Sequence, residues 1–300
     1  GVQACALPIS TCGESQAIGL EQVSCNLCGA EDSVELFRRG DLAVGLGGEF
    51  AVRRCAGCGL EYLSPRPDRD SIGWYYTPTY EPCRPVAVGG RFPGLAERFE
   101  RRRVRALLAL LPEGRLLDVG CAEGRFLRVL AREGRFELHG VEPAAGPAAR
   151  ARERHGLDVA TGTLESLRFP EGHFDAVTFW DVLEHLHDPA DALARTRRLL
   201  KPGGLLAASL PVSDSLDRRI FGRSWIGYEI PRHLYFFSTA TLTALLAGAG
   251  FRVVWQTSIF GADFAFADQV RFALRARGAS QALYGGATLL LRSRPWRLLA

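Results

Sequence analysis

The stretch Leu116-Leu-Asp-Val-Gly-Cys-Ala-Glu-Gly-Arg-Phe126 decides the fold of this chain. An apolar run leads into Asp118, and small residues follow at Gly120, Ala122 and Gly124 before a helical pattern starts. Small residues after a strand let the backbone come close to a ligand. The spacing differs from the dinucleotide fingerprint G-x-G-x-x-G, so the stretch alone predicts only a nucleotide-type binding turn.

Strand-like and helical stretches alternate downstream of residue 94. We expect strands at residues 115–119, 136–142, 157–160, 174–180, 205–210 and 251–257. Six strands alternating with helices predict an α/β fold with a doubly wound, mostly parallel, Rossmann-like sheet over residues 94–260. Ligands of such sheets bind beyond the carboxyl ends of the strands, where residues 118–124 lie.

Two Cys-x-x-Cys-Gly units organise four of the eight cysteines, namely Cys25, Cys28, Cys55 and Cys58. Each pair can occupy one tight turn in which the following glycine takes positive φ. Four thiolates supply a tetrahedral zinc shell without an open position, so we expect a structural zinc ribbon over residues 21–65. A redox pair or two disulfides are the alternatives, although disulfide frameworks belong to small secreted domains and no signal peptide is visible.

The remaining segments carry weaker signals. Residues 1–20 are expected to be a disordered lead-in, and residues 66–93 an aromatic connector that either covers an active site or packs between domains. Residues 261–300 are expected to be a helical or mixed extension that ends before a seventh strand. The arginine run at residues 101–103 is interpreted as a solvated helix face.

Composition excludes some classes of protein. A net charge of +4 over 300 residues does not by itself indicate a nucleic-acid partner. No run of about 18 uninterrupted apolar residues predicts a membrane span, and we expect a cytoplasmic protein.

Glu142 indicates which kind of ligand the turn binds. It ends the expected strand at residues 136–142, and an acid about 20 residues after the turn can accept both hydroxyls of a ribose. Neither a Walker lysine nor an arginine cluster accompanies the turn. The sequence therefore predicts a cofactor that contains a nucleoside and needs no phosphate clamp.

These features resemble the class I S-adenosylmethionine-dependent methyltransferases. Residues 118–124 are similar to the first motif of the family, Glu142 to its ribose-binding acid, residues 174–185 to its fourth motif and residues 199–204 to the turn before its fifth strand. The four cysteines and the tyrosines of the connector resemble a zinc-ribbon-bearing branch of the superfamily, many of whose members methylate small molecules such as sugars, quinone precursors or other biosynthetic intermediates.

The resemblance implies roles for individual residues. The turn backbone would approach the methionine and ribose of S-adenosylmethionine, with Asp118 near the amino group. The cofactor residues that it implies are Asp118, Gly120, Ala122, Gly124, Glu142, Leu164, Glu165, Trp180 and Asp181. Leu164 and Glu165 would lie beside the adenine, and Trp180 and Asp181 would border the transferring methyl group.

The chemistry of the methyl acceptor indicates a histidine as the general base. A hydroxyl or carbon acid must lose a proton during transfer, which suits an imidazole that titrates near neutral pH. His233 is the first choice as the base and His185 the second, with capping or core hydrogen bonding as the alternative role for each. The expected substrate residues are Tyr75, Tyr76, Tyr80, Trp225 and Tyr228, although the last two can equally pack their loop.

Three functions follow from these predictions. The first is methyl transfer to oxygen or carbon of a small-molecule intermediate. The second is a nucleic-acid methyltransferase that uses the ribbon as a reader, which the ribbon loops disfavour because they are not basic and aromatic. The third is a non-enzymatic scaffold that binds the cofactor, which the intact Asp118 and Glu142 disfavour.

Overall fold

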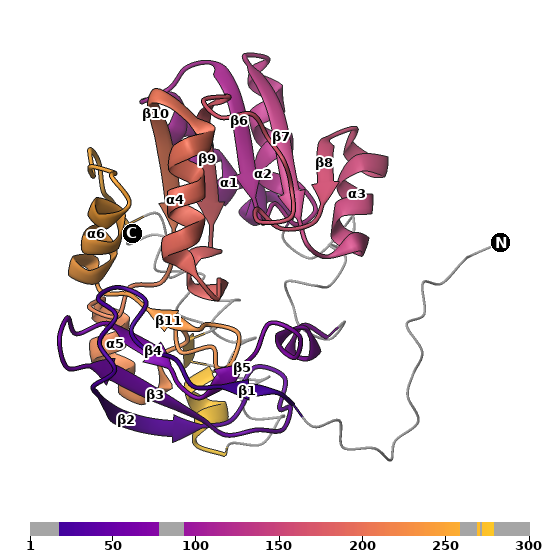
Figure 1. Cartoon of the computed structure of the whole chain (residues 1–300). Helices are drawn as coiled ribbons and strands as arrows, with labels where there is room; N and C mark the ends of the chain where they lie inside the picture. Colours follow the sequence, from indigo (N-terminus) through magenta and orange to yellow (C-terminus); the bar gives the residue numbers. More distant parts are fainter. Residues whose placement is uncertain (1–17, 78–92, 259–268, 271, 279–300) are drawn as a thin grey trace.

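The computed structural model describes residues 18–77, 93–258, 269–270 and 272–278. It contains a five-stranded sheet, a four-stranded sheet and a two-stranded ribbon (Figure 1). Most of the predicted lead-in and extension, and Tyr80 of the connector, lie outside the described residues. No helix within the described ranges combines the length and the apolar character that a membrane span requires.

The larger sheet is parallel throughout, which confirms the predicted α/β class. Its strands are β6 (Gly114–Val119), β7 (Phe136–Glu142), β8 (Asp158–Thr161), β9 (Phe174–Trp180) and β10 (Leu200–Ser209). They lie in the order β10-β9-β6-β7-β8. Because the chain moves outward from β6 in both directions, the carboxyl ends of β6 and β9 form the switch point where such sheets bind ligands.

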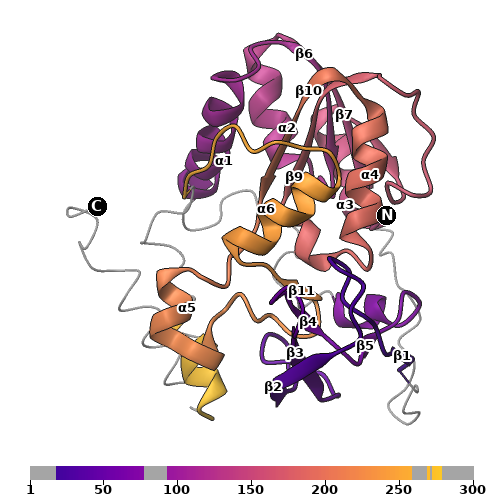
Figure 2. The same cartoon turned by 60° about the vertical axis from the view of Figure 1, so that its left-hand side comes forward.

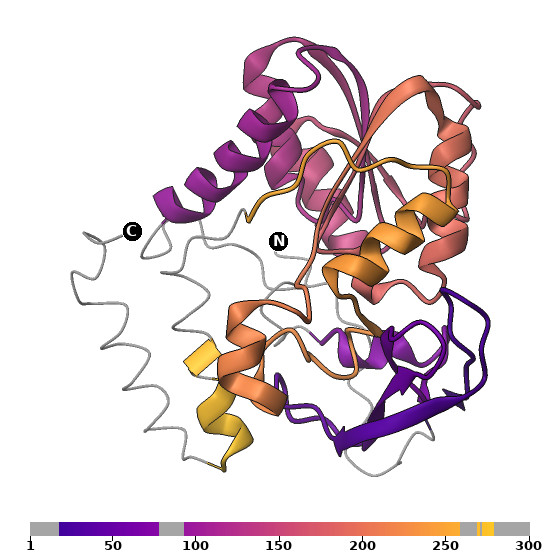
Figure 3. The ribbon, with the colours of Figure 1, turned by 90° about the vertical axis from the view of Figure 1, so that its left-hand side faces the viewer.

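Helices cover both faces of this sheet (Figure 3). One layer contains α1 (Pro93–Leu108), α2 (Arg125–Leu130), the 3-10 turn η3 (Ala131–Glu133) and α3 (Ala145–His155), and the other contains α4 (Pro189–Leu199) and α6 (Thr239–Gly248). Neighbouring strand residues face opposite layers: Leu116 packs with the first and Leu117 with the second. Burial on both faces explains why these strands are continuously apolar.

Local signals set several helix starts. The Asp188 side chain accepts a hydrogen bond from the amide of Asp191 and caps α4, and Ser238 forms a capping box with Thr241 at the start of α6. Asp and Ser are residue types that commonly cap helices in this way. Helix α3 begins at Ala145, two residues before Pro147.

The expected sixth strand is wrong. Residues 251–257 form no strand, and Val253, Val254 and Trp255 are exposed. A cavity of about 480 Å³ lies between this segment and β10. Paired strands lie about 4.8 Å apart, so a gap of this size prevents the hydrogen bonds that the alternating sequence suggested.

The smaller sheet joins distant parts of the chain (Figure 2). It has the order β11-β4-β3-β2 and contains β2 (Ser33–Arg39), β3 (Phe50–Cys55), β4 (Glu61–Leu63) and β11 (Tyr235–Phe236). Beside it, β1 (Leu20–Glu21) pairs with β5 (Arg66–Pro67). The short elements η1 (Ile72–Tyr75), η4 (Leu183–His185), α5 (Leu216–Phe221) and η5 (Gly222–Ser224) complete the described fold. Because β11 pairs with β4, the amino-terminal sheet includes a strand that follows the last strand of the large sheet in the sequence.

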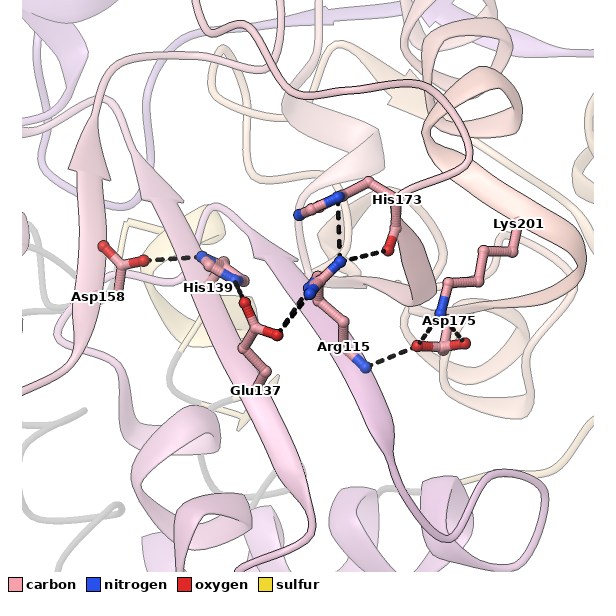
Figure 4. Close-up of polar contacts among 7 residues, drawn as sticks. All are labelled: Arg115, Glu137, His139, Asp158, His173, Asp175 and Lys201. Atoms are coloured by element: carbon pink, nitrogen blue, oxygen red, sulfur yellow. Dashed lines mark hydrogen bonds and ion pairs between the residues drawn. The ribbon is translucent and has the colours of Figure 1, made fainter.

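Charged side chains link the amino ends of the parallel strands (Figure 4). The residues drawn are Arg115, Glu137, His139, Asp158, His173, Asp175 and Lys201. Lys201 lies 2.7 Å from Asp175, and the Arg115 amide donates to Asp175 at 2.8 Å. This network lies at the end of the sheet opposite the switch point, so it aligns the strand starts and leaves the carboxyl ends for a ligand.

Candidate functional site

The glycine-rich turn (residues 118–124) has the backbone geometry that its sequence predicts. Gly120, Ala122 and Gly124 take φ of 69°, 49° and 72°. A Cβ at Gly120 would lie 2.7 Å from Val182, and one at Gly124 would lie 2.3 Å from Leu157. Both glycines are therefore required by packing against the protein itself, in addition to any ligand that approaches.

Glu142 holds the turn in place from the next strand. Its carboxylate accepts hydrogen bonds from the amides of Ala122 at 3.0 Å and Ala144 at 2.8 Å. Burial raises the pKa of Glu142. A carboxylate has about four lone-pair positions, so two remain for hydroxyl donors such as those of a ribose. These two acceptor positions thus fit the ribose hydroxyls of the nucleoside that the sequence predicts.

Asp118 is buried at the carboxyl end of β6. The Thr178 hydroxyl donates to it at 2.6 Å. Burial raises the pKa of Asp118 to about 7, and the nearby Glu100 and Glu142 carboxylates act in the same direction. The carboxyl is therefore poised to gain its charge near neutral pH, when a cationic group can compensate for its desolvation.

Leu164 and Glu165 lie in the loop that follows β8. Leu164 is buried, and Glu165 lies 3.8 Å from the guanidinium of Arg69 in an ion pair. The backbone of this loop is anchored because the Gly162 amide donates to the Glu142 carbonyl. The loop therefore lies beside the end of β7, and its acid already has a cationic partner.

Trp180 and Asp181 lie at the carboxyl end of β9, and Arg103 joins them. Arg103 lies 2.5 Å from Asp181, and its guanidinium lies 5.0 Å from the centre of the Trp180 ring. Only 5% of Arg103 is exposed, so the interpretation of residues 101–103 as a solvated face is wrong at this position. Arg103 is a site residue that the sequence reasoning missed, because it looks the same as the arginines beside it until helix α1 is docked.

His185 and His233 are brought together from separate segments, and we call them the histidine pair. Their ring centres lie 4.5 Å apart in a T-shaped arrangement. His185 Nδ1 lies 3.0 Å from the Arg232 carbonyl and 3.0 Å from the Tyr76 hydroxyl, and His233 Nδ1 lies 2.8 Å from the Gly227 carbonyl. Burial and the neighbouring His233 lower the pKa of His185 well below its usual value. Tyr76 of the connector is therefore part of the same candidate site, through its contact with His185.

The other expected substrate residues lie deeper in the protein. Tyr75 is fully buried, and its hydroxyl donates to the Gly47 carbonyl at 2.8 Å. Tyr228 is also fully buried and donates to Glu61, with Trp225 packed against its ring at 5.2 Å. These three aromatic residues pack the smaller sheet, while Tyr76 faces the histidine pair.

The cysteine cluster (Cys25, Cys28, Cys55 and Cys58) gathers four free thiols whose sulfurs all lie within 4.8 Å of one another. Sγ–Sγ distances of 3.5 Å across the two turns are close to the roughly 3.8 Å edge of a tetrahedron with Zn–S bonds of about 2.3 Å. Gly29 and Gly59 take positive φ, as the Cys-x-x-Cys-Gly pattern predicts. Burial raises the pKa of the Cys55 thiol, but hydrogen bonds from the Cys58 amide and the Cys28 thiol outweigh this effect and lower the pKa to about 7. The residues therefore fit a zinc ion that closes the two turns.

Asn26 connects the cysteine cluster to the larger sheet. Its side chain donates to Asp188 at 3.0 Å and accepts from the Ala190 amide at 3.2 Å. Asp188 is the residue that caps α4, directly after the segment containing His185. The first cysteine turn is thus docked on the end of the loop that carries His185.

Comparison with known proteins agrees with this geometry. Residues 94–256 match the family model described as a methyltransferase domain. The chain is 33% identical over 191 residues to a probable S-adenosylmethionine-dependent methyltransferase of Mycolicibacterium smegmatis, covering 61% of this chain and 72% of that protein. It is 37% identical over 137 residues to a ubiquinone biosynthesis O-methyltransferase of Cereibacter sphaeroides, covering 43% of this chain and 55% of that protein.

A solved structure shares the fold. The 1,6-didemethyltoxoflavin-N1-methyltransferase of Burkholderia thailandensis, with S-adenosylhomocysteine and 1,6-didemethyltoxoflavin bound, superposes with a TM-score of 0.50 at 20% identity. The match covers 68% of this chain and 89% of that one. Together with the family model and the M. smegmatis relative, the parallel sheet and its turn show that the chain belongs to the class I S-adenosylmethionine-dependent methyltransferases.

Proposed function

We propose that this methyltransferase transfers a methyl group to an oxygen or carbon atom of a small-molecule biosynthetic intermediate. The observation that carries the proposal is the histidine pair, in which His185 follows the carboxyl end of β9 and lies beside the Tyr76 hydroxyl. The named activity of the C. sphaeroides relative, O-methylation in ubiquinone biosynthesis, supports a hydroxyl acceptor of this kind.

S-adenosylmethionine supplies an electrophilic methyl group when it is bound. Glu142 would accept the ribose hydroxyls, Asp118 would face the amino group, and the glycine-rich turn would approach the cofactor through its backbone. Leu164 and Glu165 would lie beside the adenine. These residues contribute mainly proximity and orientation, since transfer requires an in-line approach to the methyl carbon.

The histidine pair would remove the acceptor proton. Because each Nδ1 lies beside a backbone carbonyl that can only accept, each ring carries its proton on Nδ1 and presents Nε2 as a base. The lowered pKa of His185 keeps that ring neutral at physiological pH. Tyr76 would position the pair, and residues 66–93 would act as a connector that covers the site.

Zinc in the cysteine cluster would be structural. Four protein ligands leave no open position, so the ion would cross-link two turns of the zinc ribbon over residues 21–65. Through its hydrogen bond to Asp188, Asn26 would hold the segment from His185 to Asp188 against the zinc-bound turn. The chain would thus belong to a zinc-ribbon-bearing branch of the family, with the methyltransferase domain over residues 94–260.

Radiolabelled methyl transfer tests the proposal. Purified protein would be incubated with S-adenosylmethionine carrying a labelled methyl group and with catechols, phenols, nucleotide sugars or total RNA. We expect label in a small-molecule acceptor, and label recovered in RNA alone would overturn the proposal.

Substitution of the base provides the second arm. We expect His233→Ala to lower turnover by about 10²–10⁴-fold while S-adenosylmethionine affinity stays within twofold. His187→Gln is the control, because this buried histidine lies in the loop of His185 and is bonded to the Pro67 carbonyl instead of facing the pair. Unchanged turnover and an unchanged pH profile in His233→Ala would remove histidine from the base role.

A further inference from the structure

Glu184 is a buried acid in the loop that follows β9. Only 1% of the residue is exposed, and both oxygens lack a partner among the described residues. A buried carboxylate in this condition is costly, by several kcal/mol when ionised, unless a cation or donor reaches it. The carboxyl therefore either keeps a proton or pairs with a compensating group that the described side chains do not supply.

The histidine pair stands next to this carboxylate. One ring nitrogen each of His185 and His233 and one Glu184 oxygen all lie within 4.8 Å of one another. With Nδ1 of each ring donating to a backbone carbonyl, the Nε2 lone pairs are left for a ligand. Histidines that bind metals show this arrangement, in which the second ring nitrogen donates to a carbonyl and fixes the tautomer.

The surrounding charge is negative. Burial raises the pKa of Glu184, the charges of Asp181 and Glu229 act in the same direction, and Arg103 is a cation that opposes them. Arg103 already pairs with Asp181 and Glu100. One Glu229 oxygen is likewise buried without a partner among the described residues. Arg232 also lies beside His185 but is paired with Asp41, so both arginines are engaged and the three carboxylates favour a further cation.

We propose that Glu184, His185 and His233 bind a divalent first-row transition-metal ion, at a second metal site separate from the cysteine cluster. Two imidazoles and one carboxylate form a ligand set typical of such ions and leave coordination positions open. Ligand atoms on one ion lie roughly 3–4 Å apart at bonds of about 2.1 Å, so small side-chain rotations close the observed spacing.

The ion would give the site a second way to activate an acceptor. A hydroxyl on an open coordination position has a lowered pKa, so a bound cation would replace the free imidazole in promoting its ionisation. This consequence rests on the proposed function, whereas metal binding itself does not.

Cobalt titration tests the site directly. The full chain would be loaded with zinc at the cysteine cluster and titrated with Co²⁺, with calorimetry and visible absorption as the readouts. We expect one further equivalent to bind and to show d–d bands without thiolate-to-cobalt charge transfer. Glu184→Gln and His233→Ala should each weaken cobalt binding at least tenfold, with S-adenosylmethionine binding and circular dichroism showing that each variant is folded.

His187→Gln should bind cobalt as the wild type does, since its ring lies outside the proposed ligand set. Absence of cobalt binding by the wild type at millimolar Co²⁺, or equal affinity in the wild type and both ligand variants, would overturn the proposal. Those results would leave the histidine base intact, because methyl transfer by the metal-free protein is measured separately.

Discussion

At the scale of the residue, loss of the proton from the buried Asp118 carboxyl has two opposite effects. It lowers the stability of the fold, and it favours binding of the cofactor. Its pKa in the folded protein is about 7, far above the unfolded value of about 3.9. The folded state therefore binds the extra proton between these values, and the stability contributed by Asp118 is full at about pH 4, declines toward pH 7 and levels off above it. The same loss of the proton creates the charge that would attract the cofactor amino group.

We expect the affinity for S-adenosylmethionine to rise between pH 6 and pH 8 in the wild type and to stay flat in Asp118→Asn. Calorimetric titration at several pH values measures this. Urea unfolding of both proteins supplies the control: raising the pH from 5 to 8 should destabilise the wild type relative to Asp118→Asn by about 2.7 kcal/mol, because only the roughly two pH units between 5 and the folded pKa of about 7 contribute. Parallel pH profiles in both measurements would contradict this account of Asp118.

At the scale of the element, the glycine-rich turn depends on both its conformation and the space around it. Gly120 takes φ of 69° and faces Val182, whereas Gly134 takes φ of 65° with open space beside it. A Cβ in the left-handed region costs about 1–2 kcal/mol at either position. The contact at 2.7 Å with Val182 is specific to Gly120.

We therefore expect Gly120→Ala to destabilise the protein by about 1–3 kcal/mol more than Gly134→Ala does. Urea denaturation compares the two variants directly. Gly120→Ala should also weaken S-adenosylmethionine binding, because the turn must shift to relieve the contact. Equal losses of stability in the two variants would show that only the backbone conformation matters.

The cysteine cluster affects the structure of a neighbouring element, because Asn26 in its first turn contacts Asp188 at the start of α4. Cys55→Ser should lower the zinc content, the unfolding temperature and turnover together, since the docked Asn26 then loses its rigid support. Asn26→Ala separates the two effects: we expect it to keep zinc but to weaken the capped start of α4, at a cost of about 0.5–2 kcal/mol. Metal analysis and thermal unfolding are the measurements, and equal zinc in the wild type and Cys55→Ser would refute the four-cysteine site.

At the scale of the whole molecule, a buried ion pair joins the smaller sheet to the segment that carries His233. Arg232 and Asp41 are both fully buried at the side chain and lie 3.0 Å apart, and Arg232 also donates to the Tyr75 carbonyl. Removing one partner of a buried pair leaves an uncompensated charge, which costs about 3–5 kcal/mol.

Arg232→Met should therefore destabilise the protein by about that amount and lower turnover, because His233 is the next residue. Lys201→Met is the matched control: Lys201 pairs with Asp175 at a partly exposed position, so we expect a loss of at most about 1 kcal/mol and unchanged methyl transfer. Chemical denaturation tests both, and a similar small loss in each would mean that the buried pair does not hold the two parts together.

Local sequence determined the elements that depend on short-range spacing. The turn after β6, the glycines that follow each cysteine pair and the caps of α4 and α6 were all predictable, because each depends on residues within a few positions of one another. The parallel order of the central strands was predictable as a class, since alternating helices and strands leave few right-handed arrangements.

Only the tertiary structure decided what those elements bring together. His233 reaches His185 and Glu184 because β11 pairs with β4 while the His185 segment follows β9. Arg103 is buried because α1 packs over Trp180, and residues 251–257 lie outside the sheet because a cavity separates them from β10. Residues far apart in sequence meet through packing of the whole chain, and the spacing of residue types along it carries no information about such contacts.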